Sequence, residues 1–163
     1  MRYSCAFFLA LSLAACGKPQ GSATALSPCV ATPGDTLRIE KAWVRAQPDA
    51  TGMSAAYFTL CNAGTAPVTV EGLSTPAASL VELHETTRDA KGVVSMAPTG
   101  PITVAPGERV VFEPGGKHAM LMSLAAPIAE GSTATLTLDL AGGEKVVAEA
   151  KAVSAVDAAG HSH

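Results

Sequence analysis

The chain has 163 residues, a formal net charge of −3 and an aromatic content of 4%, while 48% of its residues are hydrophobic. This length suits one domain with its own apolar core, and the absence of a basic stripe excludes a nucleic-acid partner. Because aromatic residues are so few, we expect a core built from Val, Leu, Ile, Ala and Met.

The first segment, residues 1–15, is typical of a secretory signal peptide of the lipoprotein type. Arg2 supplies the positive charge, and Ala6–Ala15 is an apolar run too short to span a bilayer as a mature helix. The run ends in Leu-Ala-Ala-Cys, which predicts cleavage before Cys16 and a lipid anchor on that cysteine. The protein would then be held on the periplasmic side of a bacterial membrane. An ordinary signal peptide cut nearby would instead leave a soluble periplasmic protein.

Three segments are expected after the signal peptide. Residues 16–35 are rich in Pro, Gly, Ser, Thr and Ala and predict a lipidated flexible tether. Residues 36–152 predict one folded domain, and residues 153–163 a flexible tail.

Four cysteines are present, and only two are candidates for pairing. Cys5 leaves with the signal peptide and Cys16 carries the expected lipid. Cys29 and Cys61 remain, and in an oxidising compartment a disulfide between them is the expected state. The alternative is that one or both thiols bind metal, but their wide spacing, without a CxxC motif, argues against a thiolate site.

From Asp35 onward, short β-prone runs alternate with turn residues. The run at residues 135–139, TLTLD, alternates as a half-buried strand should, and Gly142-Gly143 predicts a hairpin turn. The glycine pair before Lys117 would let the chain turn sharply into the strand that follows. No segment has a long helical period, so the pattern predicts an all-β antiparallel sandwich or barrel. The expected strands are Leu37–Val44, Ala55–Cys61, Val68–Leu73, Leu80–Glu85, Val93–Met96, Ile102–Val104, Arg109–Phe112, Ala119–Leu124, Ala134–Leu140 and Lys145–Ala150.

The histidines and methionines outside the signal peptide are few, four of each, so their placement is informative. His118 and Met120 share one face of a candidate strand, since side chains alternate with a period of two. His84 lies at the end of another strand. A hairpin between residues 85 and 93 would bring Met96 back towards His84.

The chemistry of such a set points to copper. Thioether sulfur is neutral and soft and suits Cu(I), while imidazole suits copper in both oxidation states. A blue-copper centre would need a cysteine between two histidines, and Cys61 lacks those neighbours. The alternative is that the methionines fill the core. That is expected of Met122, while Met53 either lines the site or packs beside it. No catalytic constellation stands out, so no enzymatic activity is expected.

The full spacing is His84, eleven residues, Met96, twenty-one residues, then His118-x-Met120. This pattern resembles the periplasmic copper chaperone PCu(A)C family, as do the stretches IEKAWVRAQPDATGMSAAYFTLCNAG, VELHET and GKHAMLM. The resemblance implies a cupredoxin-like or immunoglobulin-like β-sandwich that binds Cu(I). It also implies supply of copper to the CuA subunit of cytochrome c oxidase, with a thioredoxin-fold Sco-like protein as co-worker. The implied metal ligands are His84, Met96, His118 and Met120.

The chain departs from the family pattern at two places. Many members carry another methionine one or two residues after the first histidine, where Glu85 and Thr86 stand here. Some members carry a longer His- and Met-rich tail that binds Cu(II). Here only His161 and His163 remain, and weak Cu(II) binding by them is the most that the tail implies.

Three functions are compatible with these observations. The first is a copper chaperone for oxidase assembly. The second is a copper-buffering or copper-sensing lipoprotein without an oxidase client. The third is a β-sandwich interaction module that binds no metal.

Overall fold

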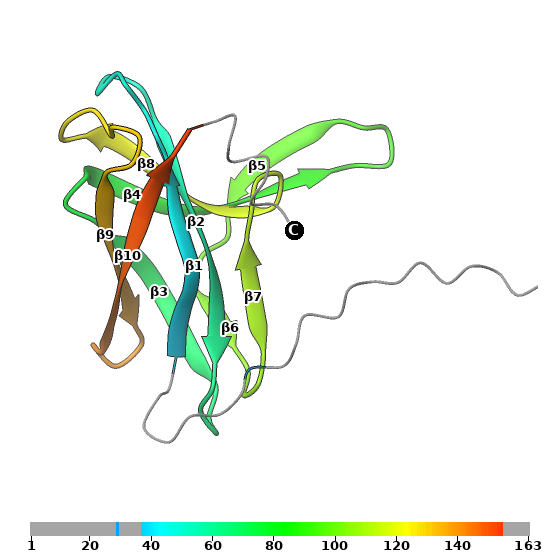
Figure 1. The fold of residues 1–163 in the computed structure, drawn as a ribbon. Helices are drawn as coiled ribbons and strands as arrows, with labels where there is room; N and C mark the ends of the chain where they lie inside the picture. Colours follow the sequence, from blue (N-terminus) through cyan, green and yellow to red (C-terminus); the bar gives the residue numbers. More distant parts are fainter. Residues whose placement is uncertain (1–28, 30–36, 155–163) are drawn as a thin grey trace, which may run out of the picture.

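The computed structural model describes Cys29 and residues 37–154, and its regular elements are ten β-strands (Figure 1). Each expected strand is found, with ends that differ by a few residues. The described residues include no helix long and apolar enough to cross a membrane. The strands are β1 Leu37–Arg45, β2 Ser54–Asn62, β3 Val68–Ser74, β4 Ala78–Arg88, β5 Val94–Pro98, β6 Ile102–Val104, β7 Arg109–Phe112, β8 Lys117–Leu124, β9 Thr133–Leu140 and β10 Lys145–Val153.

Several sequence-based predictions concern residues outside this described part. The signal peptide, the anchor at Cys16, the rest of the 16–35 tether other than Cys29, and the tail histidines His161 and His163 all lie there. β10 extends to Val153, so this strand takes in the first residue of the expected tail.

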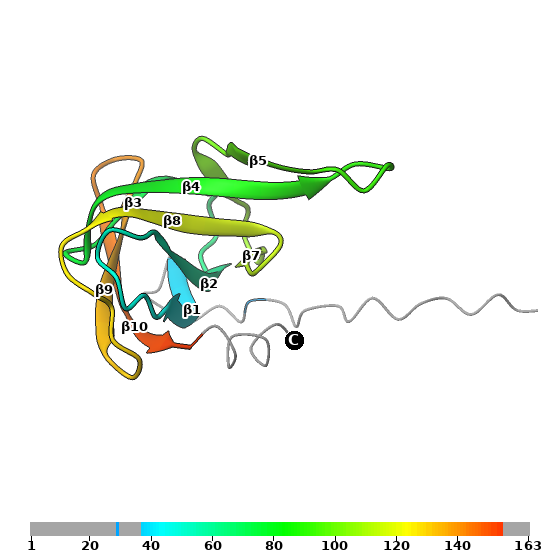
Figure 2. The same cartoon turned by 90° about the horizontal axis from the view of Figure 1, so that it is seen from above.

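The strands form one sheet that folds back on itself as a sandwich. Its order is β5-β4-β8-β7-β2-β1-β10-β9-β3-β6, with a further pairing of β8 with β2. Viewed from above, β4 and β8 form a layer over β2, β1 and β10 (Figure 2). The sheet is mixed and not wholly antiparallel, because β1 pairs in parallel with β10, and β7 briefly with β8. Alternation along a strand shows which side chains are buried, but it does not show which strand lies beside it.

The core lies between the layers and follows the period of two in each strand. In β9, the residues Ala134, Leu136, Leu138 and Leu140 are buried and alternate with half-exposed or exposed neighbours. Phe58 and Phe112 stack in the core with ring centroids 4.3 Å apart. The prediction that methionine helps to fill this core is wrong for the residues that the structure describes, because all four of their methionines face outward, exposed or half-exposed.

Two predicted turns depend on glycine. Gly142 and Gly143 have φ values of 99° and 86° and form the predicted turn between β9 and β10. Gly115, with φ 84°, allows the sharp turn that leads from β7 into β8. Such positive φ values are strained for residues with a Cβ atom. The second turn fixes where β8 begins, and therefore where His118 lies.

A disulfide joins Cys29 to Cys61 in β2, with their Cα atoms 5.6 Å apart. The predicted pairing is therefore confirmed. The bond closes a loop across a sequence separation of 32 residues, which in the chain-entropy model stabilises the fold by about 3–4 kcal/mol. It ties Cys29 to the fully buried Cys61 of β2.

The hairpin of β4 and β5 projects beyond the other strands (Figures 1 and 2). We call its outer part, residues 86–96, the arm. All residues of β5 are exposed. The turn at its tip is closed by the Asp89 carboxylate, which accepts hydrogen bonds from the backbone N–H groups of Lys91 and Val93 at 2.8 and 2.9 Å.

Candidate metal centre

The candidate ligands lie on the outer face of the layer formed by β4 and β8. In β8, Ala119 and Leu121 point inward and are fully buried, so His118 and Met120 occupy the opposite face. In the neighbouring strand β4, Leu83 points into the core, which puts the adjacent residue His84 on this outer face as well. The same alternation that builds the core therefore gathers these side chains outside it.

The register of β4 and β8 brings three of the four candidates together. His84 pairs directly with His118, and the centroids of their rings are 5.9 Å apart. Glu82 pairs with Met120, one step along the same face. His118 is buried, with a relative exposure of 6%. Two imidazoles and one thioether thus share a compact patch of the sheet.

Met96 lies on the same face but further out. Its partner across the hairpin is Thr86, while His84 pairs with Pro98. The chain therefore returns towards His84 as predicted. Met96 lies on the arm, diagonally across the hairpin from His84, because it pairs with the residue two positions further along β4. Its side chain is 50% exposed. In a flat sheet, this register would separate the Cα atoms of Met96 and Met120 by roughly 16 Å.

The hydrogen bonds of the two imidazoles decide which ring nitrogens are available to a metal. His118 Nδ1 lies 3.1 Å from the carbonyl oxygen of Gly116, which can only accept, so Nδ1 carries the proton and Nε2 the lone pair. His84 Nε2 lies 2.8 Å from the carboxylate of Glu82. His84 Nδ1 is buried and has no hydrogen-bond partner. A buried nitrogen with a lone pair and no partner is costly for a protein, and its chemistry fits a metal ion.

Aromatic side chains border the imidazoles on the side of β2. Tyr57 lies 6.5 Å from His118 between ring centroids, and it stacks on Trp43 at 4.3 Å. Burial raises the pKa of Tyr57, against the opposing effect of the Arg45 charge, so its hydroxyl stays neutral at physiological pH. The patch therefore combines neutral donors with an apolar border.

The departure from the family pattern at Glu85 does not touch this face. Glu85 pairs with Lys117 across the two strands, and its carboxylate accepts a hydrogen bond from the Lys117 ammonium at 2.5 Å. Because position 85 alternates with His84, its side chain leaves the sheet on the opposite side. Thr86 does share the face, where it pairs with Met96.

Sequence reasoning missed Glu82, which holds His84. The signal was present, because residues 82 and 84 are two apart in one strand and must share a face. It also assigned Met122 to the core. This is wrong, since Met122 lies two residues beyond Met120 on the outer face and is half-exposed. Among residues 37–154 and Cys29, no three His, Cys, Asp or Glu side chains form a metal-binding group.

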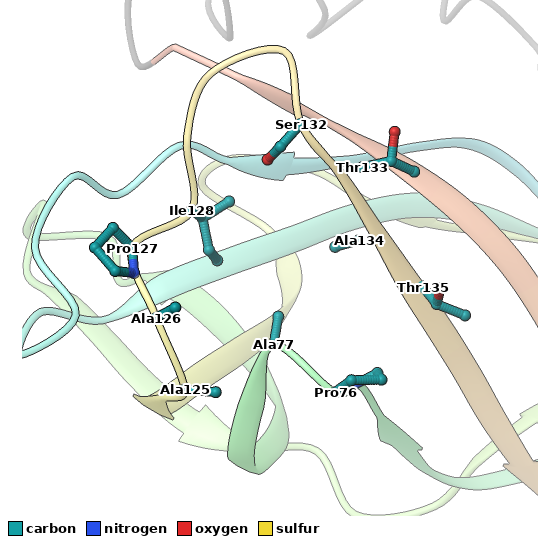
Figure 3. A pocket seen from close by; sticks show the side chains of 10 residues that line it. All are labelled: Pro76, Ala77, Ala125, Ala126, Pro127, Ile128, Ser132, Thr133, Ala134 and Thr135. Carbon is teal, nitrogen blue, oxygen red and sulfur yellow. The ribbon is translucent and has the colours of Figure 1, made fainter.

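A surface pocket of about 320 Å³ lies elsewhere, between the β3–β4 turn, the β8–β9 connection and the start of β9 (Figure 3). Its lining contains no histidine, methionine, cysteine or carboxylate. The lining residues are Pro76, Ala77, Ala125, Ala126, Pro127, Ile128, Ser132, Thr133, Ala134 and Thr135. The pocket is therefore separate from the outer-face patch and offers no soft ligand.

A family model and a curated relative both match this chain, and both are described as putative lipoproteins. The family model described as "Putative lipoprotein LpqE-like" matches residues 37–152. A curated protein of Leifsonia xyli subsp. xyli, "Putative lipoprotein Lxx21020", is 35% identical over 127 residues, which cover 76% of this chain and 75% of that protein.

Solved structures share the fold. The apo PCuAC domain from PmoF1 has a TM-score of 0.61 at 19% identity, covering 74% of this chain and 95% of that domain. The copper-bound PCuAC domain from PmoF2 has a TM-score of 0.59 at 22% identity, covering 74% and 94%. The solution structure of CuI-DR1885 from Deinococcus radiodurans has a TM-score of 0.56 at 26% identity, covering 76% and 83%. The predicted cupredoxin-like sandwich and the resemblance to PCu(A)C proteins are confirmed.

Proposed function

The chain belongs to the LpqE-like lipoprotein family, and on this basis we propose that it is an extracytoplasmic copper chaperone, without enzymatic activity, that carries Cu(I). The observation that supports this most is the buried, unpartnered Nδ1 of His84 beside the imidazole of His118. The copper-bound state of two structural relatives gives further support. The proposed ligands are His84, Met96, His118 and Met120.

In this proposal β8 supplies the fixed half of the site. His118 presents Nε2, because its Nδ1 is occupied by the Gly116 carbonyl, and Met120 adds a thioether from the same strand. His84 presents Nδ1, while Glu82 holds its Nε2–H. A carboxylate in this position fixes the ring orientation and makes the imidazole a better donor.

Met96 supplies the movable half. In a flat sheet its Cα atom would lie roughly 16 Å from that of Met120, so in this proposal the arm bends towards β8 to bring the Met96 sulfur to an ion held there. Cu(I) forms stable sites with soft neutral donors, so three ligands can retain the ion while the fourth leaves. An acceptor ligand can then take the place of Met96 without release of the ion into water.

The proteins that take part in copper transfer are proposed from the resemblance to PCu(A)C proteins. We propose that the client is the CuA subunit of cytochrome c oxidase and that a Sco-like thioredoxin-fold protein acts in the same transfer. Lipidation at Cys16 would hold the domain on the periplasmic side of the membrane, near such membrane-bound partners. His161 and His163 would bind Cu(II) weakly, as histidine-rich tails do.

The test of metal binding is a Cu(I) titration of the full chain against a competing Cu(I) chelator. The parent is expected to bind one equivalent tightly, and the double variant Met96→Leu/Met120→Leu to lose it, while both retain the same β-sheet circular dichroism. The matched control is Met53→Leu/Met122→Leu, which makes the same chemical change on the same face and should keep the tight equivalent. Equal binding by parent and Met96→Leu/Met120→Leu would refute the proposal.

The client requires a separate test in cells. Deletion of the gene should lower cytochrome c oxidase activity when copper is scarce, and added copper should restore it. Replacement with the Met96→Leu/Met120→Leu variant should behave like the deletion. Full oxidase activity in the deletion strain at low copper would favour a buffering or sensing role over delivery.

A further inference from the structure

Two more methionines lie on the outer face, beyond the four proposed ligands. Met122 follows Met120 by two residues in β8 and so shares its face. Ser54 of β2 pairs with Leu121 and Ala55 with Met120. Met53 precedes β2, and continuing this register by one step beyond the last paired residues would set Met53 opposite Met122. Directly opposite positions on neighbouring strands have Cβ atoms about 5 Å apart, within reach of two long thioether side chains.

These methionines are not placed for packing. Met53 is 52% exposed, and Met122 is half-exposed. Leu80, which pairs with Met122 on its other side, is 48% exposed. The described core contains no methionine at all, although this flexible side chain is well suited to filling gaps. Core packing therefore does not explain why three thioethers, those of Met120, Met122 and Met53, lie on one solvent-facing surface.

We propose that Met53 and Met122, together with Met120, form a second, thioether-only Cu(I) site one step along the sheet from the histidines. Three neutral soft donors suit Cu(I) and have little affinity for Zn(II), Ca(II) or Mg(II). The site lacks imidazole, so it binds Cu(I) more weakly than the histidine site does. It extends the metal-binding surface from the arm to the start of β2.

Sharing Met120 gives the second site a role in transfer. A Cu(I) ion bound to the Met120 sulfur can exchange the imidazoles of His84 and His118 for the sulfurs of Met122 and Met53. No electron or proton moves in this step, because the ion stays Cu(I) and all the exchanged ligands are neutral. This role depends on the proposed function, whereas binding at the second site does not.

The backbone around Met53 is held in place from the neighbouring segment. Its carbonyl oxygen accepts hydrogen bonds from the Arg45 guanidinium at 2.9 Å and from the Gln47 side-chain amide at 3.0 Å. These bonds fix the start of β2 and therefore the origin of the Met53 side chain. The positive charge of Arg45 also opposes a bound cation nearby, which suits a site that an ion passes through rather than one that retains it.

The test uses Ag(I), a diamagnetic substitute for Cu(I), and the full chain labelled with ¹³C at the methionine methyl groups. Each methionine then reports separately by nuclear magnetic resonance. The first equivalent is expected to shift the signals of Met96 and Met120. A second equivalent finds Met120 already engaged and is expected to bind the remaining two sulfurs, shifting the signals of Met53 and Met122.

Two variants separate this site from the histidine site. In His84→Ala/His118→Ala, Ag(I) should still shift Met53 and Met122, even if the proposed function is wrong. In Met53→Leu/Met122→Leu, the second equivalent should disappear and the first remain. Leu80→Met, which adds a thioether directly opposite Met122, should tighten the second equivalent several-fold. Unshifted Met53 and Met122 signals in the parent at excess Ag(I) would overturn the proposal.

Discussion

β8 and the arm contribute to the same candidate centre, but they are built very differently. β8 lies inside the sheet, where it pairs with β4, β2 and β7, and its alternate residues Ala119 and Leu121 are fully buried. Beyond Thr86, whose backbone N–H donates to the Gly116 carbonyl at 3.0 Å, the arm pairs only within its own hairpin, and every residue of β5 is exposed. One region can hold a ligand in a fixed position, and the other can bring a ligand in and take it away.

The contacts of the arm explain this difference. Its cross-strand bonds lie at the surface, such as the hydroxyl pair of Thr87 and Ser95 at 2.9 Å and the bond from Arg88 to the Gly92 carbonyl at 2.9 Å. Exposed hydrogen bonds without a buried apolar face belong to the least stable parts of a protein. A chaperone needs both regions, because a wholly rigid centre would release its ion slowly.

The largest expected effect comes from removing a ligand on β8. His118→Ala should lower Cu(I) affinity by more than about 100-fold, because the ligand is lost from the preformed half and no neighbour can replace it; loss of an outer partner alone costs about 10–100-fold. A chelator competition titration measures this change. Tyr57→Phe is the control, since it keeps the ring against His118 and removes only the hydroxyl. If His118→Ala bound Cu(I) as tightly as the parent, β8 would not be the fixed half.

A smaller effect is expected from the β4 residue that holds His84. Glu82→Leu removes the acceptor that holds His84 Nε2–H, and it should weaken Cu(I) binding by about 10–100-fold. Glu82→Gln should restore most of the affinity, because an amide oxygen also accepts. In the Ag(I)-loaded parent, the ¹⁵N spectrum should show the metal on Nδ1 of His84, and in Glu82→Leu a mixture of Nδ1 and Nε2. Metal on Nε2 in the parent would contradict the assigned role of Glu82.

The smallest effect on affinity should come from the arm itself. Met96→Leu should weaken Cu(I) binding by about 10-fold, since one neutral donor is lost and the cost of ordering the arm is saved. Hydrogen exchange provides the more specific measurement. Cu(I) should slow exchange of the arm amides in the parent but not in Met96→Leu, with the β8 amides unchanged in both.

Val94→Leu is the matched control for that experiment. Val94 is also exposed on β5, two residues before Met96 and on the same face, but it offers no ligand. The Val94→Leu variant should bind Cu(I) as tightly as the parent, and Cu(I) should slow hydrogen exchange of its arm amides to the same extent. Protection of the arm in Met96→Leu would mean that closure does not depend on the thioether.

Much of this protein could be predicted from residue order. Local alternation predicted all ten strands, and glycine pairs predicted the turns before β8 and between β9 and β10, because strand period and positive φ depend on adjacent residues. The His/Met spacing predicted the family for a similar reason. The spacing between the ligands reflects the lengths of the strands and of the hairpin that carry them, and these lengths are set along the chain.

Other features depended on strands far apart in sequence. The amino-acid sequence by itself determined that the chain is all-β, that Cys29 and Cys61 are available to pair, and that His118 and Met120 share a face. Only the tertiary structure decided that β10 runs parallel to β1, that Met122 faces outward, and that Glu82 holds His84 while Met96 lies out on the arm. The physical reason is register: each strand has two faces, and its partner strand decides which one becomes core and which residues across it become neighbours.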